Sequence, residues 1–472
     1  MKTAIWWLRR DLRLTDNQAL DAALERAEAV VPVFVLDPTI LDRPTTGSVR
    51  VAFLLEGLRH LDAALRERGS RLVVRRGDPV DELAAVVEAT GARAILAEVD
   101  FTPHARARDD RVARQLPLER VGGRLVHPPG TILKADGDPY VVYTHFARKW
   151  KARTPPTWGV LLPAPDRIPT PEGVDGLPIP EKPALPGGVP FPSGEAEARR
   201  RLSAFASGDD APLYRYAERR NRVDLDATSR LSPYLHLGML SSRQVVVGAR
   251  EAMDAAPGDA AREGAETWLD ELVWREFFVH ILYHFPHVLE KSFRETLRSI
   301  RWAEDEAAFA AWCEGRTGYP LVDAAMRQLN ETGWMHNRAR MVVGSFLVKD
   351  LLINWQRGET YFMRRLVDGD WASNNGGWQW VAGTGTDAAP YFRIFNPVSQ
   401  SKKHDPNGAY IRRWVPELGA VPDPFIHAPW EMPEDLARNV GCEIGVDYPA
   451  PVVDHARARE RTLAAYRAAR EE

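Results

Sequence analysis

The chain has 472 residues, of which 44% are hydrophobic, and a formal net charge of -3 at pH 7. This length exceeds that of one ordinary hydrophobic core and predicts two domains. The slightly acidic balance excludes a generally basic nucleic-acid-binding protein, so any affinity for DNA must come from a local basic patch. The two cysteines, Cys313 and Cys442, are too few for a disulfide framework or a metal cluster. We therefore expect no metal site and a reducing environment.

The amino terminus lacks a basic-then-apolar leader, and no apolar run approaches the ~20 residues that a membrane-spanning helix needs. These features predict a soluble, cytoplasmic protein without a membrane partner. The sequence does not determine the oligomeric state, for which a monomer is the expectation.

Residues 1–130 alternate short β-branched runs with amphipathic helical patterns, which is typical of a parallel sheet covered by helices. The expected strands are AIWWL at 4–8, VVPVFVL at 30–36, RLVVRR at 71–76, ARAILAEV at 92–99 and GRLVH at 123–127. No G-x-G-x-x-G follows the first strand, so the usual dinucleotide-binding fingerprint is absent. The pattern predicts a Rossmann-like α/β domain but does not by itself indicate a bound nucleotide.

Residues 131–195 are expected to form a long irregular connector between two domains. Twelve of the 36 prolines fall between Pro155 and Pro192, with several glycines and little apolar periodicity. From residue 196 to 472 the pattern is helical almost throughout, and eleven of the fifteen tryptophans follow residue 260. The predicted fold class is therefore α/β plus all-α, with a second domain that is rich in indole rings.

The segment from Thr228 to Pro233 places hydroxyls and a guanidinium just before a proline suited to the first turn of a helix. Ser232 is the expected N-cap, and the free N–H groups of a helix amino terminus bind phosphate well. An ordinary N-cap without a ligand explains the same residues, so both interpretations stay open at this point.

Two later segments share the spacing i, i+3 and i+4, which puts three side chains on one face of a helix. The two triplets are Glu271, Trp274 and Arg275, and Asn337, Arg340 and Met341. Such faces are suited to the opposing walls of one pocket. A solvated amphipathic face explains either triplet alone.

The stretch from Asp368 to Pro397 combines acids, adjacent amides and tryptophans within a few positions. Such a mixture is costly to bury unless its polar groups have partners, so it predicts the lining of a cavity for a large, flat molecule with polar edges. The uneven spacing of the tryptophans, together with Gly376 and Gly377, favours loops and turns over a helix. The alternative is a helical core segment whose polar side chains are satisfied.

This stretch resembles the signature of the DNA photolyase and cryptochrome family nearly letter for letter. The resemblance extends, in the family's order, through WWLRRDLRLTDN, TSRLSPYLHLG, WLDELVWREF, TGYPLVDAAMRQL and GWMHNRARM. It implies an amino-terminal α/β antenna domain and a carboxyl-terminal helical domain that binds FAD, most like the class I enzymes for cyclobutane pyrimidine dimers. The implied activity is light-dependent repair of ultraviolet-damaged DNA, without sequence specificity, by electron transfer from photoexcited reduced FAD to the flipped-out dimer.

The resemblance also implies where FAD binds. The implied residues are Tyr216, Thr228, Ser229, Arg230, Leu231, Ser232, Glu271, Arg275, Asn337, Arg340, Asp368, Asp370 and Asn374. Asn374 matches the family position beside the flavin N5, where an amide can accept a hydrogen bond but cannot titrate. Plant-type cryptochromes carry an acid at that position, so this amide argues for repair over signalling.

For the substrate, the resemblance implies a cavity wall and a ring of phosphate contacts. Glu271 and Asn337 are the implied catalytic groups that hydrogen-bond the dimer, and Glu271 must carry a proton in order to donate. The implied stacking and packing surfaces are Trp274, Met341 and Trp380. The implied phosphate contacts are Arg220, Arg338, Arg393 and Lys403, which would position DNA without reading its sequence.

Three further indoles, Trp378, Trp355 and Trp302, match the family's electron relay from the flavin to the surface. Ordinary core packing explains each of them singly, so the relay is carried by the resemblance alone. Trp371 matches no role and is expected to belong to the core.

The light-harvesting chromophore is expected in a crevice beside the sheet. Arg50 and Asp100 match relatives that bind 8-hydroxydeazaflavin, but Thr102 stands where their second acid is expected. The amide that folate-binding relatives use near Glu98 and Val99 is missing. We favour 8-hydroxydeazaflavin over methenyltetrahydrofolate and FMN, and an empty crevice stays open.

Three other functions compete with dimer repair. A cryptochrome-type photoreceptor is opposed by Asn374 and by the short charged segment from His455 to Glu472 in place of a long tail. A photolyase for the (6-4) lesion would carry a pair of histidines in GWMHNRARM, where His336 stands alone and Met341 occupies the wall. A helical flavoprotein without a light-dependent role would leave the aromatic pocket unexplained.

Overall fold

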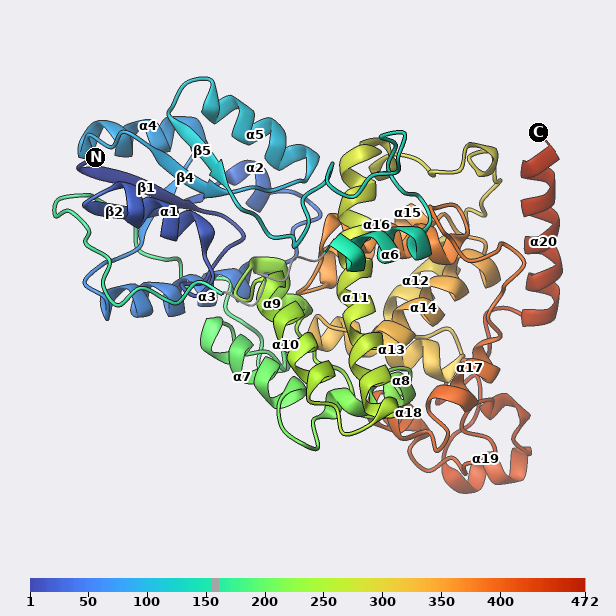
Figure 1. The fold of residues 1–472 in the computed structure, drawn as a ribbon. Coiled ribbons are helices and arrows are strands. Elements are labelled where there is room, and N and C mark those ends of the chain that lie inside the picture. The colour runs from blue at the N-terminus through green and yellow to red at the C-terminus, as the bar shows by residue number, and fades with distance from the viewer. Residues whose placement is uncertain (154–160, 472) are drawn as a thin grey trace.

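The computed structural model describes residues 1–153 and 161–471. Figure 1 shows an α/β body formed by the amino-terminal part of the chain beside a larger helical body. One continuous hydrophobic cluster joins them, with Trp6 and Leu8 on the side of the sheet and Tyr234 and Trp268 on the side of the helices. The predicted fold class, α/β plus all-α, is confirmed.

The α/β body contains a five-stranded parallel sheet with the strand order β3-β2-β1-β4-β5. The strands are β1 (Thr3–Leu8), β2 (Ala29–Leu36), β3 (Val73–Arg76), β4 (Ile95–Glu98) and β5 (Leu118–Val121), and the helices are α1 (Gln18–Arg26), α2 (Pro38–Leu41), α3 (Ser48–Arg66), α4 (Pro79–Thr90) and α5 (Pro103–Ala113). Strand β1 is buried on both faces because helices cover both sides of the sheet. The strand order reverses at β1, and ligand crevices of such sheets open at this point, beside the carboxyl ends of the strands.

The expected fifth strand at 123–127 is wrong, because β5 ends before Gly122. Gly122 and Gly123 have φ values of 60° and 146°, which turn the chain away from the sheet. The backbone N–H of Val126 then donates to the buried carboxylate of Glu276 in the helical body. This apolar segment is buried because it crosses between the two bodies and not because it pairs with β4.

The helical body surrounds the long helix α11. Its helices are α6 (Tyr143–Arg153), α7 (Glu195–Ala206), α8 (Tyr216–Arg219), α9 (Ser232–Leu237), α10 (Ser242–Asp254), α11 (Asp259–His284), α12 (Glu306–Glu314), α13 (Pro320–Thr332), α14 (Asn337–Ser345), α15 (Trp355–Arg365), α16 (Trp371–Ala382), α17 (Pro397–His404), α18 (Ala409–Trp414), α19 (Glu434–Val440) and α20 (His455–Glu471), with a π-helical turn η5 (Phe346–Asp350) and the short turns η2 (Pro212–Arg215), η3 (Pro286–Leu289), η4 (Glu295–Leu297), η6 (Pro416–Leu418) and η7 (Pro429–Glu431). Figure 1 shows α20 at the far edge of this body from the sheet.

In its described residues, the expected connector at 131–195 contains a helix that the sequence did not predict. This helix is α6, whose Tyr143 ring stacks on Trp274 of α11 with the ring centroids 3.7 Å apart. Residues 161–194 are irregular. Residues 162–177 run along the α/β body, where the N–H of Leu177 donates to the carbonyl of Val74, and Phe191 packs against Trp334 of the helical body. Residues 154–160 of the connector lie outside the described residues. The domain boundaries at 130 and 195 stay a prediction.

The stretch that was expected to form loops and turns is helix α16. Asp370 caps it by accepting hydrogen bonds from two N–H groups of its first turn, each at 3.1 Å. Gly376 does not bend the helix: a Cβ there would lie 2.1 Å from the ring of Phe278, so this glycine lets α16 approach α11 closely. Close packing has overridden the low helix propensity of the glycines.

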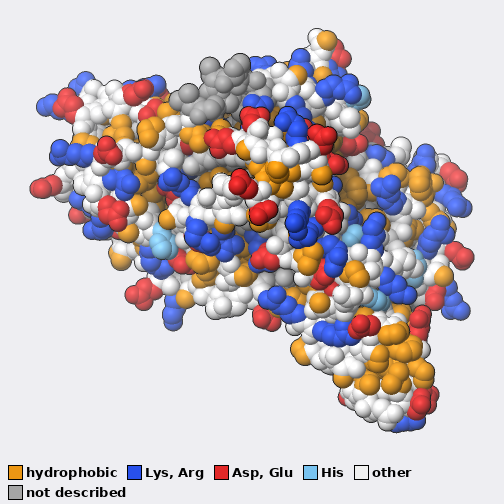
Figure 2. Space-filling model, turned by 60° about the horizontal axis from the view of Figure 1, so that its bottom comes forward, with side chains coloured by type: hydrophobic (Ala, Val, Ile, Leu, Met, Phe, Trp, Pro, Cys, Tyr) orange, Lys and Arg blue, Asp and Glu red, His pale blue; other side chains and the backbone are white. Residues whose placement is uncertain are grey.

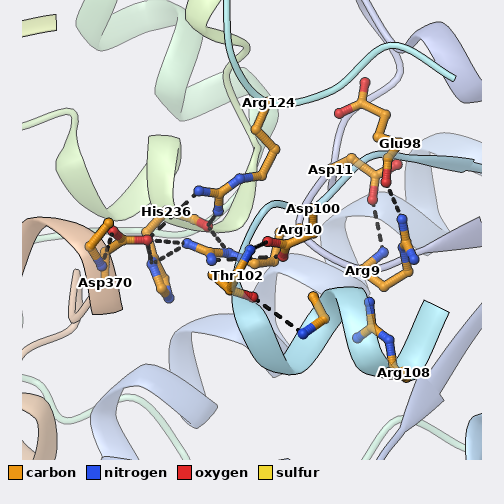
Figure 3. A network of polar contacts seen from close by, with 12 residues as sticks. Arg9, Arg10, Asp11, Glu98, Asp100, Thr102, Arg108, Arg124, His236 and Asp370 are labelled. Atoms are coloured by element: carbon orange, nitrogen blue, oxygen red, sulfur yellow. Dashed lines mark hydrogen bonds and ion pairs between the residues drawn. The ribbon is translucent and has the colours of Figure 1, made fainter. Parts of the chain in front are cut away.

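A buried ion-pair network holds α16 against the α/β body (Figure 3). Arg10, which follows β1, donates from Nη2 to Oδ2 of Asp370 at 2.6 Å and from Nε to the carbonyl of His236 at 2.9 Å. Its Nη1 lies 3.8 Å from Asp100, which follows β4. Burial alone would raise the pKa of Asp370, but the charge of Arg10 holds it well below its ordinary value. The N-cap of α16 is therefore a carboxylate whose charge is balanced from the other body.

The two adjacent glycines of α16 allow a matched test of this packing. Gly376→Ala overpacks the contact with Phe278, and we expect it to lower the free energy of unfolding by about 1–3 kcal/mol. Gly377→Ala, whose Cβ would have no atom within 4 Å, should raise stability by up to about 1 kcal/mol through helix propensity. Urea unfolding followed by tryptophan fluorescence measures both, and equal effects would contradict the close-approach role of Gly376.

Arg10→Met removes the charge nearest to Asp370 and keeps most of the side chain's length. We expect a loss of about 3 kcal/mol in the free energy of unfolding, because the change leaves buried carboxylates without their main counter-charge. Arg66→Met breaks the exposed pair with Asp62 and should cost less than about 1 kcal/mol. Denaturant unfolding followed by circular dichroism compares the two variants, and similar small costs would exclude a special role for Arg10.

Candidate functional site

A cavity of about 520 Å³ opens into the helical body between α8, α9, α11, α14 and α16. It gathers residues that lie far apart in the sequence and that were predicted for the cofactor, the substrate or the relay. The predicted residues that line it are Tyr216, Arg220, Thr228, Ser229, Leu231, Ser232, Glu271, Trp274, Arg275, Asn337, Arg338, Arg340, Met341, Asp368, Asp370, Asn374, Trp378 and Trp380. The two triplets on α11 and α14 thus contribute to one pocket and are not separate solvated faces.

One polar region of the cavity is organised around Asp368. Arg340 donates from Nη2 to both of its oxygens, at 2.8 and 3.1 Å, and the hydroxyl of Ser232 donates to Oδ2 at 2.6 Å. The prediction of Ser232 as an N-cap is wrong, because α9 begins at this residue and has no side-chain cap. Its hydroxyl is instead occupied by Asp368.

Of the FAD-binding residues predicted from Thr228 to Ser232, Arg230 is the one that does not line the cavity. Its backbone is left-handed, with φ at 49°, and its guanidinium lies over the ring of Trp334, 5.1 Å from the centroid. It also pairs with Asp226 at 2.9 Å. The side chain therefore packs on the side of the segment away from the cavity, while Thr228 and Ser229 line the cavity.

The adjacent amides of α16 have different surroundings. Asn374 lines the cavity, and its amide nitrogen donates to the carbonyl of Glu359 at 3.0 Å. This bond orients the amide and leaves its oxygen as the acceptor for a ligand. Asn375 is buried on another side of the helix, where its amide nitrogen donates to the carbonyl of Val288 at 2.9 Å. Asn375 is therefore a structural residue, and Asn374 is the one that can contact a ligand.

The substrate wall predicted on α11 contains an ion pair. Arg220 of the α8 region donates from Nη1 to Oε1 of Glu271. Burial raises the pKa of Glu271 above its ordinary value, and the charge of Arg220 opposes this rise. The state of this acid thus depends on where Arg220 lies. One turn further along α11, Trp274 is fixed by its stack on Tyr143.

A second hollow of about 310 Å³ adjoins the cavity at its mouth. Arg338, Arg393 and Lys403, three of the four predicted phosphate contacts, line it together with Trp380. Arg338 is held by Asn221, whose oxygen accepts from its Nη2 at 2.7 Å and from its Nε at 3.1 Å. Figure 2 shows acidic and basic side chains interspersed over one face of the molecule, as the net charge implies. The basic groups at the mouth are therefore a local feature.

The three relay indoles differ in exposure. Trp378 and Trp355 are buried in one hydrophobic cluster, and Trp302 is partly exposed and packs against the same cluster. Trp378 lines the cavity, and the Trp355 indole nitrogen donates to the hydroxyl of Ser292 at 3.3 Å. Trp302 lies edge-on to Tyr466, with the centroids 6.2 Å apart. The order from a cavity wall to a partly exposed indole is compatible with a relay and also with simple packing.

A separate crevice of about 200 Å³ opens at the carboxyl ends of β1, β2 and β4. Arg50, Asp100 and Thr102 line it as predicted. Arg50 is already bonded to backbone carbonyls, including that of Met363 at 2.9 Å, and burial lowers its pKa to about 10. Thr102 caps α5 and donates its N–H to Asp100 at 3.0 Å. Trp371, expected in the core, is instead a half-buried residue of the crevice wall.

The sequence analysis missed His236, which lines both the cavity and the crevice. Burial and the neighbouring charge of Arg10 lower its pKa to about 3, so the imidazole is neutral and Nδ1 can accept from Nη2 of Arg10 at 2.9 Å. A signal was available, because His236 follows Ser232 by one helical turn and shares its face. It was overlooked because a histidine near a helix end is usually structural.

No helix in residues 1–153 or 161–471 is both long and apolar enough to span a membrane. Within the same residues, no three histidine, cysteine or acidic side chains gather as a metal ion would require.

Comparison with known proteins bears directly on these sites. Residues 4–170 match the family model described as DNA photolyase, and residues 268–468 match the one described as the FAD binding domain of DNA photolyase. A deoxyribodipyrimidine photo-lyase of a Synechococcus strain is 41% identical over 98% of this chain and 96% of its own.

Solved structures agree with the relatives. A class III photolyase from Agrobacterium tumefaciens has a TM-score of 0.93 at 38% identity and covers 100% of this chain and 98% of its own. A cryptochrome from Synechocystis has a TM-score of 0.89 at 30% identity, covering 98% and 99%. A photolyase from Sulfolobus tokodaii, solved with two FAD molecules, has a TM-score of 0.80 at 31% identity, covering 99% and 100%. The chain therefore belongs to the DNA photolyase family.

Proposed function

We propose that the protein is a deoxyribodipyrimidine photo-lyase, an enzyme that uses light to split cyclobutane pyrimidine dimers in DNA. The observation that carries this proposal is the cavity in which the polar groups expected for FAD meet the groups expected for a pyrimidine dimer, with arginines at its mouth. The photo-lyase names of relatives at about 40% identity over their full length support the same reaction.

The cavity residues fit FAD in chemistry and in shape. Thr228 and Ser229 offer hydroxyls for the diphosphate, and Asn374 offers an amide oxygen for an N–H of the flavin ring. A Cβ on Gly377 would meet nothing within 4 Å, so the backbone of α16 presents a flat surface there. Bound there in its reduced form, FAD would supply the light-driven electron transfer that opens the cyclobutane ring without a net change of oxidation state.

The other residues hold the substrate. A flipped-out dimer would stack between Trp274 and Trp380 and pack on Met341, with Asn337 and a protonated Glu271 donating to its carbonyls. Arg338, Arg393 and Lys403 would contact phosphates around the mouth. The dimer is weakly stacked and weakly paired with the opposite strand, so flipping it out of the duplex costs less than flipping out undamaged bases.

Arg220 has two possible partners, the carboxylate of Glu271 and a phosphate of DNA. In the free protein it pairs with Glu271, which favours the carboxylate. A phosphate that draws Arg220 away removes the counter-charge, and burial then favours the neutral acid that can donate to the dimer. Docking of DNA would thus bring Glu271 into its donor state.

A photoreceptor of the cryptochrome type is the second candidate, because a cryptochrome is among the structural neighbours. Asn374 favours repair over this alternative, since its amide cannot pass a proton to the flavin. A (6-4) photolyase is disfavoured because His336 is the only histidine in the segment GWMHNRARM, where that activity would need a pair, and because Met341 occupies the cavity wall.

We further propose the crevice as the antenna site. Arg43 and Arg108 line it beside Arg50, which supports a planar chromophore with an anionic edge. 8-Hydroxydeazaflavin remains the favoured ligand over methenyltetrahydrofolate and FMN, and the second FAD of the Sulfolobus protein supports a flavin as the alternative. The absorbance spectrum of the chromophore extracted from protein made in its native host distinguishes them. A cytoplasmic monomer stays our expectation.

Illumination of the reduced, flavin-loaded protein with a thymine-dimer oligonucleotide should remove the dimer, while a dark sample should not.

Affinity for this oligonucleotide should fall as the pH rises through the raised pKa of Glu271, because only the protonated acid donates. Glu271→Gln should make the affinity nearly independent of pH, whereas Glu266→Gln on the exposed side of α11 should not. Fluorescence anisotropy in the dark measures the affinity. In the illumination experiment, absence of light-dependent loss of the dimer with reduced FAD bound would exclude the proposed enzymatic function.

The relay predicts a change in one step only. Trp302→Phe should slow the light-driven reduction of bound flavin by an added thiol, because phenylalanine is much harder to oxidise than indole. Repair by enzyme that was chemically reduced beforehand should be unchanged. Trp414→Phe, in α18, removes an indole outside the relay and serves as the control. Equal photoreduction rates in both variants would show that Trp302 is only a packing residue.

A further inference from the structure

The loop from Gly383 to Asn396 carries Arg393 to the mouth of the cavity. Its first half is fastened to the body, for example by the N–H of Arg294, which donates to the carbonyl of Thr384 at 2.9 Å. Beyond Tyr391 the described backbone hydrogen bonds are local, such as that from Ile394 to Phe392, until Asn396 caps α17. Tyr391 is therefore the last firm attachment before Arg393.

Tyr391 is attached to the carboxyl-terminal helix α20. Its ring stacks on that of Tyr466, with the centroids 6.1 Å apart and the planes within 8°. The guanidinium of Arg470 lies 5.3 Å from the Tyr391 centroid, within the range of a cation–π contact. Residues near the end of the chain thus hold a residue two positions before Arg393.

A buried lysine contacts both Tyr391 and Tyr466. Lys349 of η5 donates from Nζ to the carbonyls of Tyr391 and Ala382, each at 3.2 Å, and lies 3.9 Å from the centroid of the Tyr466 ring. The Tyr466 hydroxyl donates to the carbonyl of Ala382 at 2.7 Å. Loop, end of α16, η5 and α20 therefore share one polar contact point within an apolar cluster.

Helix α20 is itself docked firmly on η5. Nδ1 of His455 lies 2.6 Å from Oδ1 of the buried Asp350, and Arg461 donates to the carbonyl of the same residue at 2.6 Å. The hydroxyl of Thr462 donates to the carbonyl of Lys349. The helix has several anchors of its own, so it can serve as a fixed support for the loop.

We propose that α20 is a positioning element for DNA binding: through Tyr466 and Arg470 it holds Tyr391, and thereby keeps Arg393 in place to contact a phosphate of damaged DNA. A loop that is already ordered loses less conformational entropy when DNA binds, so the support raises affinity without touching the DNA. This inference rests on the proposed function, which assigns the mouth of the cavity to DNA.

Two variants at the contact test the proposal, namely Tyr391→Ala and Arg470→Ala. Each should bind a dimer-containing duplex about threefold more weakly in the dark, which is the size of one exposed charge contact. The slope of log K against log salt should also become shallower, by up to about 0.9, as it does when one phosphate contact is lost. Arg467→Ala is the matched control, since Arg467 is exposed on the same helix and has no partner among the described residues.

Two further comparisons separate positioning from general damage. Tyr391→Phe keeps the stacked ring and should bind DNA as the unaltered protein does. In an Arg393→Ala background, Tyr391→Ala should have no additional effect, because the group that it positions is already gone. Flavin absorbance, which reports the intact cavity, should be unchanged in all variants.

The outcomes are distinct. Unchanged affinity of Tyr391→Ala and Arg470→Ala, with tight binding by the unaltered protein, would overturn the positioning role alone. Additive losses in the Arg393→Ala background would overturn it as well. Failure of the unaltered protein to bind the damaged duplex would overturn the proposed function, and this inference with it.

Discussion

The buried pair between Arg10 and Asp370 is the interaction on which the arrangement of both sites depends. Asp370 caps α16, the helix that carries Asn374 and two of the cavity tryptophans, and Arg10 extends from the end of β1. Charge balance across the two bodies therefore sets the position of α16. It also makes the segment around Gly369 a common wall, with the cavity on one side and the crevice on the other. Under the proposed function, this wall would hold an antenna and a flavin at a constant separation.

The chain is slightly acidic overall, and its acidic and basic side chains are interspersed over the face that Figure 2 shows. A local group of basic residues, Arg338, Arg393 and Lys403, lies where a polyanion would enter the cavity, and Arg220 lies in the cavity wall. Several of them are held by neutral or acidic partners in the free protein: Arg338 by an amide and Arg220 by Glu271. Such partners orient each guanidinium, and a phosphate can displace them because these side chains are partly accessible to solvent. The affinity expected for DNA therefore comes from this local group of basic residues and depends on the salt concentration.

The errors of the sequence analysis have physical causes. The glycines and amides of α16 have low helix propensity, and only the close approach to Phe278 shows why a glycine is needed there. The apolar segment after Gly123 has the composition of a strand, but its burial comes from the helical body. Ser232 fits an N-cap by its place in the sequence, and a carboxylate more than a hundred residues away engages its hydroxyl instead. In each case a contact distant in sequence overrode a correct local rule.

The sequence by itself determined the two-body fold class, which follows from hydrophobic pattern, and the motifs that identify the family. Through the resemblance that these motifs carry, it also gave eighteen of the thirty residues that line the cavity. Only the tertiary structure decided that Asn375 bonds to the carbonyl of Val288, that Glu271 is paired with Arg220, and that α20 contacts Tyr391 in the loop of Arg393. These features depend on directions and distances between residues far apart in the chain. No local pattern encodes them.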